Sequence, residues 1–194
     1  MANNLTSWVT VKANDDTLKY VDSLVTKAEE KIEKDTYGIT AFAKAFYKDV
    51  DCGDGGGVMY DWALDNIGAK WTYLEDVQGE GEFSLTSAWY PPKEFYIHLY
   101  KLCAELDENI EIEVQYEDES YDPIGAVVIK KDKDGTPCYW WEEELSIENP
   151  TDDMDWDDEG YDEAQQEFYD EIYETKQELL KECHSLVLTD GEPI

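Results

Sequence analysis

The sequence predicts an α+β protein in which helices cover one face of an antiparallel sheet. Short segments with alternating apolar side chains and many β-branched residues, which are typical of strands, recur along the chain. Longer segments carry apolar residues at every third or fourth position, which is typical of amphipathic helices. The expected order of strand, helix, strand, helix, strand, strand, strand, helix is that of a sheet elaborated from a split βαβ unit.

The N-terminal part is expected to begin with a strand and continue with helices. Residues 5–11 alternate in polarity and are rich in β-branched side chains, so they predict a strand. After the turn-forming residues 14–16, apolar residues recur at helical spacing over residues 18–32. A shorter helical pattern covers residues 39–47. The glycine-rich run 51–57 predicts a loop, because glycine loses much backbone entropy in regular structure.

The middle of the chain is expected to complete the sheet. Residues 82–89 predict a strand that ends at a Pro-Pro pair, and Pro92 can open the helix expected over residues 93–106. A turn at residues 132–135 indicates that the last two strands form a hairpin. The three strands expected after this helix are residues 110–116, 124–130 and 137–145. Residues 1–145 are therefore expected to form one domain.

The C-terminal part, residues 146–194, is expected to be an acidic connector followed by a helix packed on that domain. The connector covers residues 146–160, and the helix covers residues 161–186. One side of this helix is apolar and the others carry mainly carboxylates, so one face is expected to pack and the rest to face water. Its apolar stripe consists of Phe168, Ile172, Leu179, Cys183 and Leu186.

The charge is extreme and unevenly distributed. The chain has 48 Asp and Glu against 15 basic residues, a formal net charge of −33, and every basic residue is Lys. Residues 1–60 carry 10 acids and 7 Lys, whereas residues 61–194 carry 38 acids and 8 Lys. With 7 Trp and 14 Tyr the chain still has enough large side chains to fold. A solubilising or halophilic surface is one explanation, but halophilic acidity is normally spread evenly.

Composition also limits the function classes. Arg is the usual bidentate ligand of phosphate, so its absence and the negative charge disfavour direct binding of nucleic acid or of anionic membranes. The four cysteines are far apart and form no CxxC pair, as expected of reduced thiols in a cytosolic protein. We find no signal-peptide pattern and no apolar run of membrane-spanning length, so a cytoplasmic location is expected.

One stretch of the sequence is similar to a known family. The pattern D-W-x-x-x-N-x-G-x-K-W is formed by Asp61-Trp62 and by residues 66–71, which have the sequence NIGAKW. A strand that ends in A-W-x-P-P follows, at residues 87–92 with the sequence SAWYPP. This pattern resembles the Api92-like or YubB-type ferredoxin-like family of plasmids and phages. The resemblance implies a ferredoxin-like core and a mobile-element setting, and it supplies no activity.

The resemblance is specific over residues 59–92 and covers roughly residues 5–145. The chain departs from the family at Ile67, where an aromatic residue is usual, and near Gly125, where the usual glycine pattern is not evident. The acidic C-terminal part lies outside it. Trp62, Trp71 and Trp89 are expected to pack together as an aromatic corner of the sheet.

Candidate catalytic motifs are weak. His98 lies five positions before Cys103, and His184 directly follows Cys183, so neither pair shares a helix face. The glycine-rich run lacks the Lys-Ser/Thr of a phosphate-binding loop. The acids between Asp152 and Glu163 offer the alternative of a calcium or magnesium module or a metal-dependent enzyme. However, the calcium-loop pattern that starts at Asp155 has Gln166 at its twelfth position instead of Glu.

The acidic surface itself is the strongest candidate. Carboxylates three and four positions apart lie on one side of a helix, so the last helix is expected to present a linear array of negative charge. We therefore expect a non-enzymatic protein without a cofactor that mimics nucleic acid. Its expected partner is a basic host protein, such as a defence enzyme or a DNA-binding protein. The expected partner-binding residues are Asp155, Asp157, Asp158, Glu163, Glu167, Asp170, Glu171, Glu174, Tyr169 and Tyr173.

Overall fold

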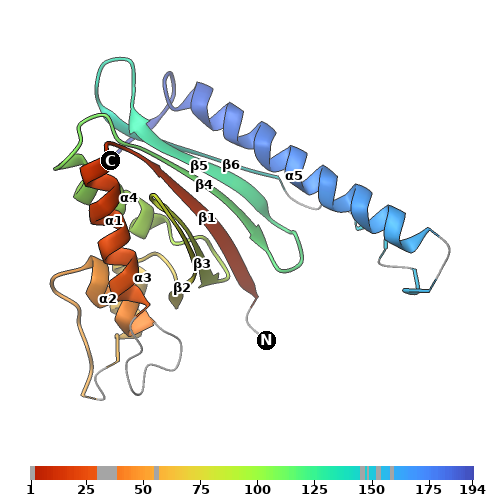
Figure 1. Cartoon of the computed structure of the whole chain (residues 1–194), viewed down its shortest axis with the longest axis horizontal. Helices are drawn as coiled ribbons and strands as arrows, with labels where there is room; N and C mark the ends of the chain where they lie inside the picture. The colour runs from red at the N-terminus through yellow and green to blue at the C-terminus, as the bar shows by residue number, and fades with distance from the viewer. Residues whose placement is uncertain are drawn as a thin grey trace.

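The computed structural model describes residues 3–29, 39–54, 57–144, 147, 149–151, 154–157 and 160–194. Within them, seven strands form one sheet in the order β2-β3-β1-β4-β5-β6-β7, and each neighbouring pair is antiparallel (Figure 1). The α+β class is therefore confirmed. The strands are β1 Asn4–Lys12, β2 Thr72–Gly79, β3 Glu82–Ala88, β4 Glu111–Asp118, β5 Ile124–Lys131, β6 Pro137–Glu144 and β7 Glu192–Pro193.

Two helical crossovers connect the first four strands. Helices α1 to α3 lie in the chain between β1 and β2, and α4 lies between β3 and β4. In the sheet, β3 separates β2 from β1, and β1 separates β3 from β4. With seven strands among the described residues, this sheet is larger than that of a ferredoxin-like unit, which has four. The helices are α1 Asp15–Ala28, α2 Ile39–Phe46, α3 Tyr60–Asn66, α4 Lys93–Ala104 and α5 Tyr161–Leu186.

The main core lies between the sheet and helices α1 to α4. Side chains of β1 and β4 alternate between this core and the opposite face, as the pleat of a strand requires. On the core side, Ile112, Val114 and Tyr116 of β4 are fully buried. Their neighbours Glu111 and Glu113 point to the opposite face and are only partly buried.

Helices α1 to α4 cover one face of the sheet, and the C-terminal helix α5 covers the opposite face (Figure 1). The reason lies in β5, which is apolar at successive positions. Val127 and Ile129 belong to the main core, whereas Ala126 and Val128 form a second core cluster with α5. A strand buried on both faces needs a cover on each side. The residues of α5 and of the position directly after it that bury against the sheet are Phe168, Ile172, Leu179, Cys183 and Val187.

The sequence analysis did not predict several short elements. In β2 the register with β3 shifts twice, between Leu74 and Asp76 and between Val77 and Gly79, so its side chains do not alternate regularly. Helix α3 has only seven residues, and β7 has two. Elements of these lengths contain too few residues to establish a period.

The expected aromatic corner is not formed by all three tryptophans. Trp62 is half-buried and packs edge-to-face on Tyr47, with ring centroids 5.2 Å apart. Trp89 is 51% exposed and has a φ of 72°, because the chain leaves the sheet directly after β3. The prediction of a packed position is therefore wrong for Trp89.

Candidate interaction surface

An exposed line of carboxylates runs along α5. We call Glu163, Glu167, Asp170, Glu171, Glu174 and Glu178 the acidic stripe; all six side chains are exposed. They follow one another at spacings of one to four positions and occupy the side of α5 opposite its buried residues. From Glu163 to Glu178 the helix rises about 22 Å. This gives about one charge per 4.5 Å, close to the ~3.4 Å spacing of phosphates along one strand of DNA.

The structure brings together most of the residues expected to bind a partner. Glu163, Glu167, Asp170, Glu171 and Glu174 all belong to the stripe. Asp155 and Asp157 are exposed in the segment before α5. Asp158 lies outside the described residues.

Two aromatic side chains accompany the stripe, as expected. Tyr169 is 44% exposed and Tyr173 is 62% exposed. Tyr169 also contacts Tyr121, with ring centroids 6.1 Å apart. The sequence analysis did not single out one exposed aromatic side chain, Trp156, which is 82% exposed. A single large aromatic within the acidic run of residues 155–158 was the signal that could have identified it.

Neither Lys of α5 interrupts this line of carboxylates. Lys181 is exposed, and it lies beyond the last residue of the stripe. Within the stripe, Gln166 donates a hydrogen bond to Asp170 at 2.8 Å. This bond orients the carboxylate without neutralising it.

The other Lys of α5 points inward and anchors the helix. Lys176 forms an ion pair with Glu117 of β4 at 2.6 Å. Its ammonium also lies 4.3 Å from the ring centroid of Trp8 on β1. The helix thus uses this cation for its attachment to the sheet and leaves the carboxylates facing outward.

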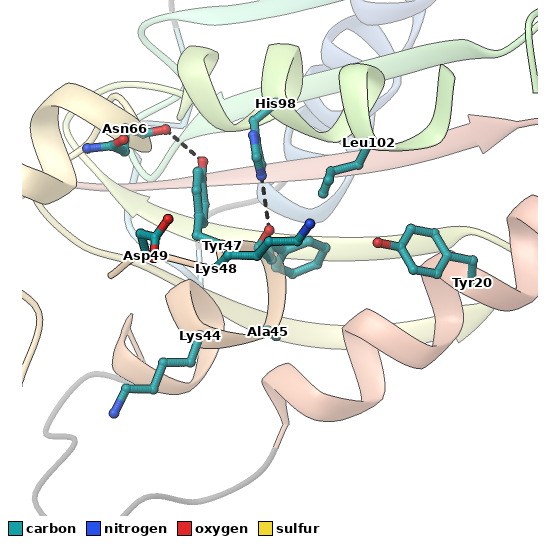
Figure 2. A pocket seen from close by; sticks show the side chains of 10 residues that line it. Tyr20, Lys44, Ala45, Tyr47, Lys48, Asp49, Asn66, His98 and Leu102 are labelled. Atoms are coloured by element: carbon teal, nitrogen blue, oxygen red, sulfur yellow. Dashed lines mark hydrogen bonds between the residues drawn. The ribbon is translucent and has the colours of Figure 1, made fainter. Parts of the chain in front are cut away.

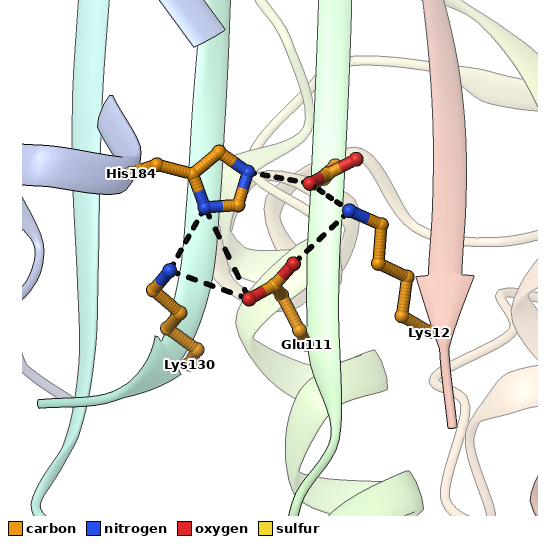
Figure 3. Close-up of polar contacts among 5 residues, drawn as sticks. Lys12, Glu111, Lys130 and His184 are labelled. Atoms are coloured by element: carbon orange, nitrogen blue, oxygen red, sulfur yellow. Dashed lines mark hydrogen bonds and ion pairs between the residues drawn. The ribbon is translucent and has the colours of Figure 1, made fainter. Parts of the chain in front are cut away.

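A second polar network attaches the C-terminal part of α5, as Figure 3 shows. His184 Nδ1 lies 2.8 Å from Lys130 Nζ, and His184 Nε2 lies 2.5 Å from a carboxylate oxygen of Glu113. A protonated Lys can only donate, so Nδ1 accepts and Nε2 carries the proton. Lys12 contacts both Glu113 and Glu111, and Lys130 lies 3.3 Å from Glu111.

The network shifts the pKa of its members. Partial burial would raise the pKa of Glu111, but the hydrogen bond from Lys12 and the charge of Lys130 outweigh it and lower the pKa. Partial burial would lower the pKa of Lys12, and its hydrogen bonds to Glu113 and Glu111 raise it instead. Both groups are therefore held in their charged forms.

The same cluster has the composition of a metal site. One ligand atom from each of Glu111, Glu113 and His184 lies within 4.8 Å of the others. However, both carboxylates are already paired with Lys12 or Lys130, so a cation would have to displace an ammonium group. We interpret the cluster as an ion-pair network. The acids expected between Asp152 and Glu163 to bind calcium or magnesium lie partly outside the described residues.

The cysteine and histidine pairs are not arranged for nucleophilic catalysis. Cys183 is fully buried and lies 3.4 Å from the carbonyl oxygen of Ala126, whereas His184 belongs to the polar network. Burial, with the charges of Glu142 and Glu182 adding to it, raises the pKa of Cys183 to about 12. Burial also raises the pKa of Cys103 to about 12. Both are thiols at neutral pH, and the thiolate is the nucleophile.

Fold and surface together define an α+β protein whose sheet is covered on both faces and whose outer helix carries an acidic stripe. A comparison with known protein families, curated proteins and solved structures finds no significant match. The resemblance to the Api92-like or YubB-type family therefore remains a prediction from the motif. Among the described residues, no helix has both the length and the apolar character needed to span a membrane.

Proposed function

We propose that this protein is a non-enzymatic inhibitor that mimics nucleic acid and occupies the basic groove of a partner protein. The acidic stripe is the observation that carries this proposal, because it repeats negative charge at nearly the spacing of one DNA strand. The expected partner is a nucleic-acid-binding or defence enzyme in the cytoplasm of a host cell that carries a phage or mobile element.

Electrostatics and aromatic contacts have different roles in this proposal. Long-range attraction between the stripe and a basic groove raises the rate of association and weakens as salt is added. Exposed aromatic side chains bury area at the contact and slow dissociation. Tyr169, Tyr173 and Trp156 are placed before or beside the stripe for that role.

The attachment of α5 supports a rigid mimic. A stripe on a mobile peptide would lose conformational entropy on binding, whereas a packed helix does not. Here the inner side of α5 is held by Phe168, Ile172 and Leu179, and by the ion pair of Lys176 with Glu117. The charges are therefore already in a line before a partner arrives.

We further propose that β1 to β4 with α1 to α4 form a ferredoxin-like core. Support comes from the strand order β2-β3-β1-β4 and from the two crossovers that carry the helices to one face. On this proposal β5 to β7 extend the core at one edge. The extension provides the platform on which residues 146–194 place α5.

The test compares two variants that have the same change in net charge. The stripe variant carries Glu163→Gln, Glu167→Gln, Asp170→Asn, Glu171→Gln and Glu174→Gln. The control variant carries Asp61→Asn, Asp65→Asn, Asp76→Asn, Glu82→Gln and Glu105→Gln, which alter exposed acids on other elements. Wild-type protein immobilised on beads should capture a basic protein from a host lysate, and duplex DNA should release it. The stripe variant should fail to capture it, and the control variant should retain it.

Two results would contradict the proposal. Equal loss of capture by both variants would indicate a general effect of acidity. Release that does not depend on duplex DNA or on salt would indicate another kind of interface. Calorimetry with calcium and magnesium is the matching test of the metal-binding alternative, because a specific site saturates stoichiometrically at micromolar metal.

A further inference from the structure

A hollow of about 650 Å³ lies between α1, α2 and α4, far in sequence from the acidic stripe. Its volume falls in the range of small-molecule sites. The lining includes two Lys and one Asp, in a chain with 48 acids and 15 Lys. The side chains that form its walls and rim in the argument below are Tyr20, Tyr47, Lys48, His98 and Leu102.

One wall of the hollow is a fixed pair of flat rings. Tyr47 and His98 stack with centroids 4.0 Å apart and an angle of 8° between their planes. The Tyr47 hydroxyl donates to the carbonyl oxygen of Asn66 at 2.6 Å, and His98 Nε2 lies 3.0 Å from the carbonyl oxygen of Phe46. Both rings are therefore held in place without a ligand.

The other polar side chains of the hollow include several hydrogen-bond donors and one carboxylate, Asp49. A carbonyl oxygen can only accept, so Nε2 of His98 carries a proton. Lys48 forms no ion pair with any of the described residues. Partial burial, with Cys103 and Glu105 adding to it, raises the pKa of Tyr20, so its hydroxyl stays a donor at neutral pH. Figure 2 shows Tyr20 facing the Tyr47–His98 pair across the hollow, with Lys48 reaching between them.

We propose that this hollow binds a small planar anion, namely an aromatic or heteroaromatic ring that bears a carboxylate or phosphate group. The ring lies against the Tyr47–His98 wall and the apolar side chain of Leu102. The anionic group pairs with the ammonium of Lys48 and accepts a hydrogen bond from Tyr20. An anion fits because the two Lys of the lining, Lys44 and Lys48, outnumber its single carboxylate, Asp49.

The proposal is tested with two aromatic anions and two incomplete probes. Adenosine 5′-monophosphate and indole-3-carboxylate each offer a ring and an anion, whereas adenosine offers only the ring and inorganic phosphate only the anion. Each probe is titrated into the full chain, and binding is measured by calorimetry and by the NMR signals of His98 and Tyr47. Salt at about 0.15 M limits repulsion by the acidic surface. At least one aromatic anion should bind about tenfold more tightly than either incomplete probe.

Matched Lys variants locate the site. Lys48→Gln should weaken binding of the tighter aromatic anion about tenfold, because it removes one charge-assisted contact. Lys133→Gln makes the same change at an exposed position in the β5–β6 turn and should leave binding unchanged. Tyr20→Phe removes only the hydroxyl and should weaken binding about threefold.

Three outcomes would overturn the inference. The first is the absence of a saturable signal from both aromatic anions at millimolar concentration. The second is an equal loss of binding in the two Lys variants. The third is a set of shifted NMR signals that belong to α5, with those of His98 and Tyr47 unmoved. None of these outcomes affects the proposed function, because Lys48 and Tyr20 lie outside the acidic stripe.

Discussion

Lys176 of α5 and Glu117 of β4 form an ion pair of 2.6 Å between residues 59 positions apart in the sequence. Only 12% of the Lys176 side chain and 21% of the Glu117 side chain are exposed. The pair joins the helix that carries the acidic stripe to the strand beneath it. Its ammonium also lies over the ring of Trp8, so the contact extends to β1.

Removing the Lys176 charge should destabilise the fold. We expect Lys176→Gln to lower the free energy of unfolding by about 2 kcal/mol, because Glu117 keeps a partly buried charge without its partner. Urea denaturation measures the change. Lys181→Gln removes an exposed charge from the same helix and should change the free energy by less than about 0.5 kcal/mol. The double variant Lys176→Gln/Glu117→Gln should recover part of the loss, and strict additivity would show that the two residues are not coupled.

A side chain at position 125 should also destabilise the sheet. Gly125 of β5 lies opposite Tyr116 of β4. A Cβ atom there would overlap the Tyr116 phenol and lie 2.7 Å from the carbonyl oxygen of Glu142. Tyr116 is fully buried and donates a hydrogen bond of 3.0 Å to Glu143, so its ring has little room to move.

We therefore expect Gly125→Ala to lower the free energy of unfolding by about 3 kcal/mol. The measurement is again urea denaturation. Tyr116→Leu makes space beside residue 125. The double variant should therefore lower the free energy of unfolding by less than the sum of the two single changes. A double variant as unstable as that sum would contradict the proposed overlap.

The sequence predicted the elements with a strong period. The strand that became β4 alternates over its whole length, and the helix that became α5 has a clear apolar stripe, so each was found within a few residues. The exposure of the helical acids followed from the same pattern. A stripe that packs on one side leaves its carboxylates on the other.

Other features could not be read from local patterns. The cover of both sheet faces follows from β5, where Ala126 to Ile129 are all buried, and a continuous apolar run does not reveal which helix covers which face. The network of Lys12, Glu111 and His184 joins three elements far apart in the sequence. Such contacts depend on strand register, which one sequence does not supply.

The contribution of Glu111 to stability should depend on pH. Partial burial would raise its pKa, but Lys12 and Lys130 lower it overall. The folded pKa thus lies below the unfolded value of about 4.3. The stabilising contribution is present above about pH 4.3 and is lost as the pH falls through the folded pKa, because the unfolded state then binds more protons.

Comparison with Glu111→Gln isolates this effect. Protonation of the many other carboxylates changes both proteins alike and cancels in the difference. Urea denaturation at several pH values should give a difference in unfolding free energy that is constant above about pH 5 and shrinks toward about pH 3. A difference that stayed constant over the whole range would mean that Glu111 has no lowered pKa.

The four thiols should differ in reactivity. Cys103 and Cys183 are fully buried with pKa values of about 12, and burial with Asp132 raises the pKa of Cys138. Cys52 is half-buried in the connection between α2 and α3. With a disulfide reagent at about pH 8, Cys52 should react first and the others only on unfolding. Cys52→Ser should remove the fast phase, and a fast phase that persisted would show that another thiol is accessible.

Charge repulsion within the stripe should limit stability in a way that depends on position. Glu167, Asp170, Glu171 and Glu174 are like charges three or four positions apart, an arrangement that destabilises a helix. Changing all four to their amides should raise the melting temperature by a few degrees at low salt, and the gain should disappear near 1 M salt. Asp162 and Glu163 lie in the first turn, where a negative charge favours the positive end of the helix dipole. The amide variant of this pair should therefore lower the melting temperature, and a rise in both variants would mean that net charge alone governs stability.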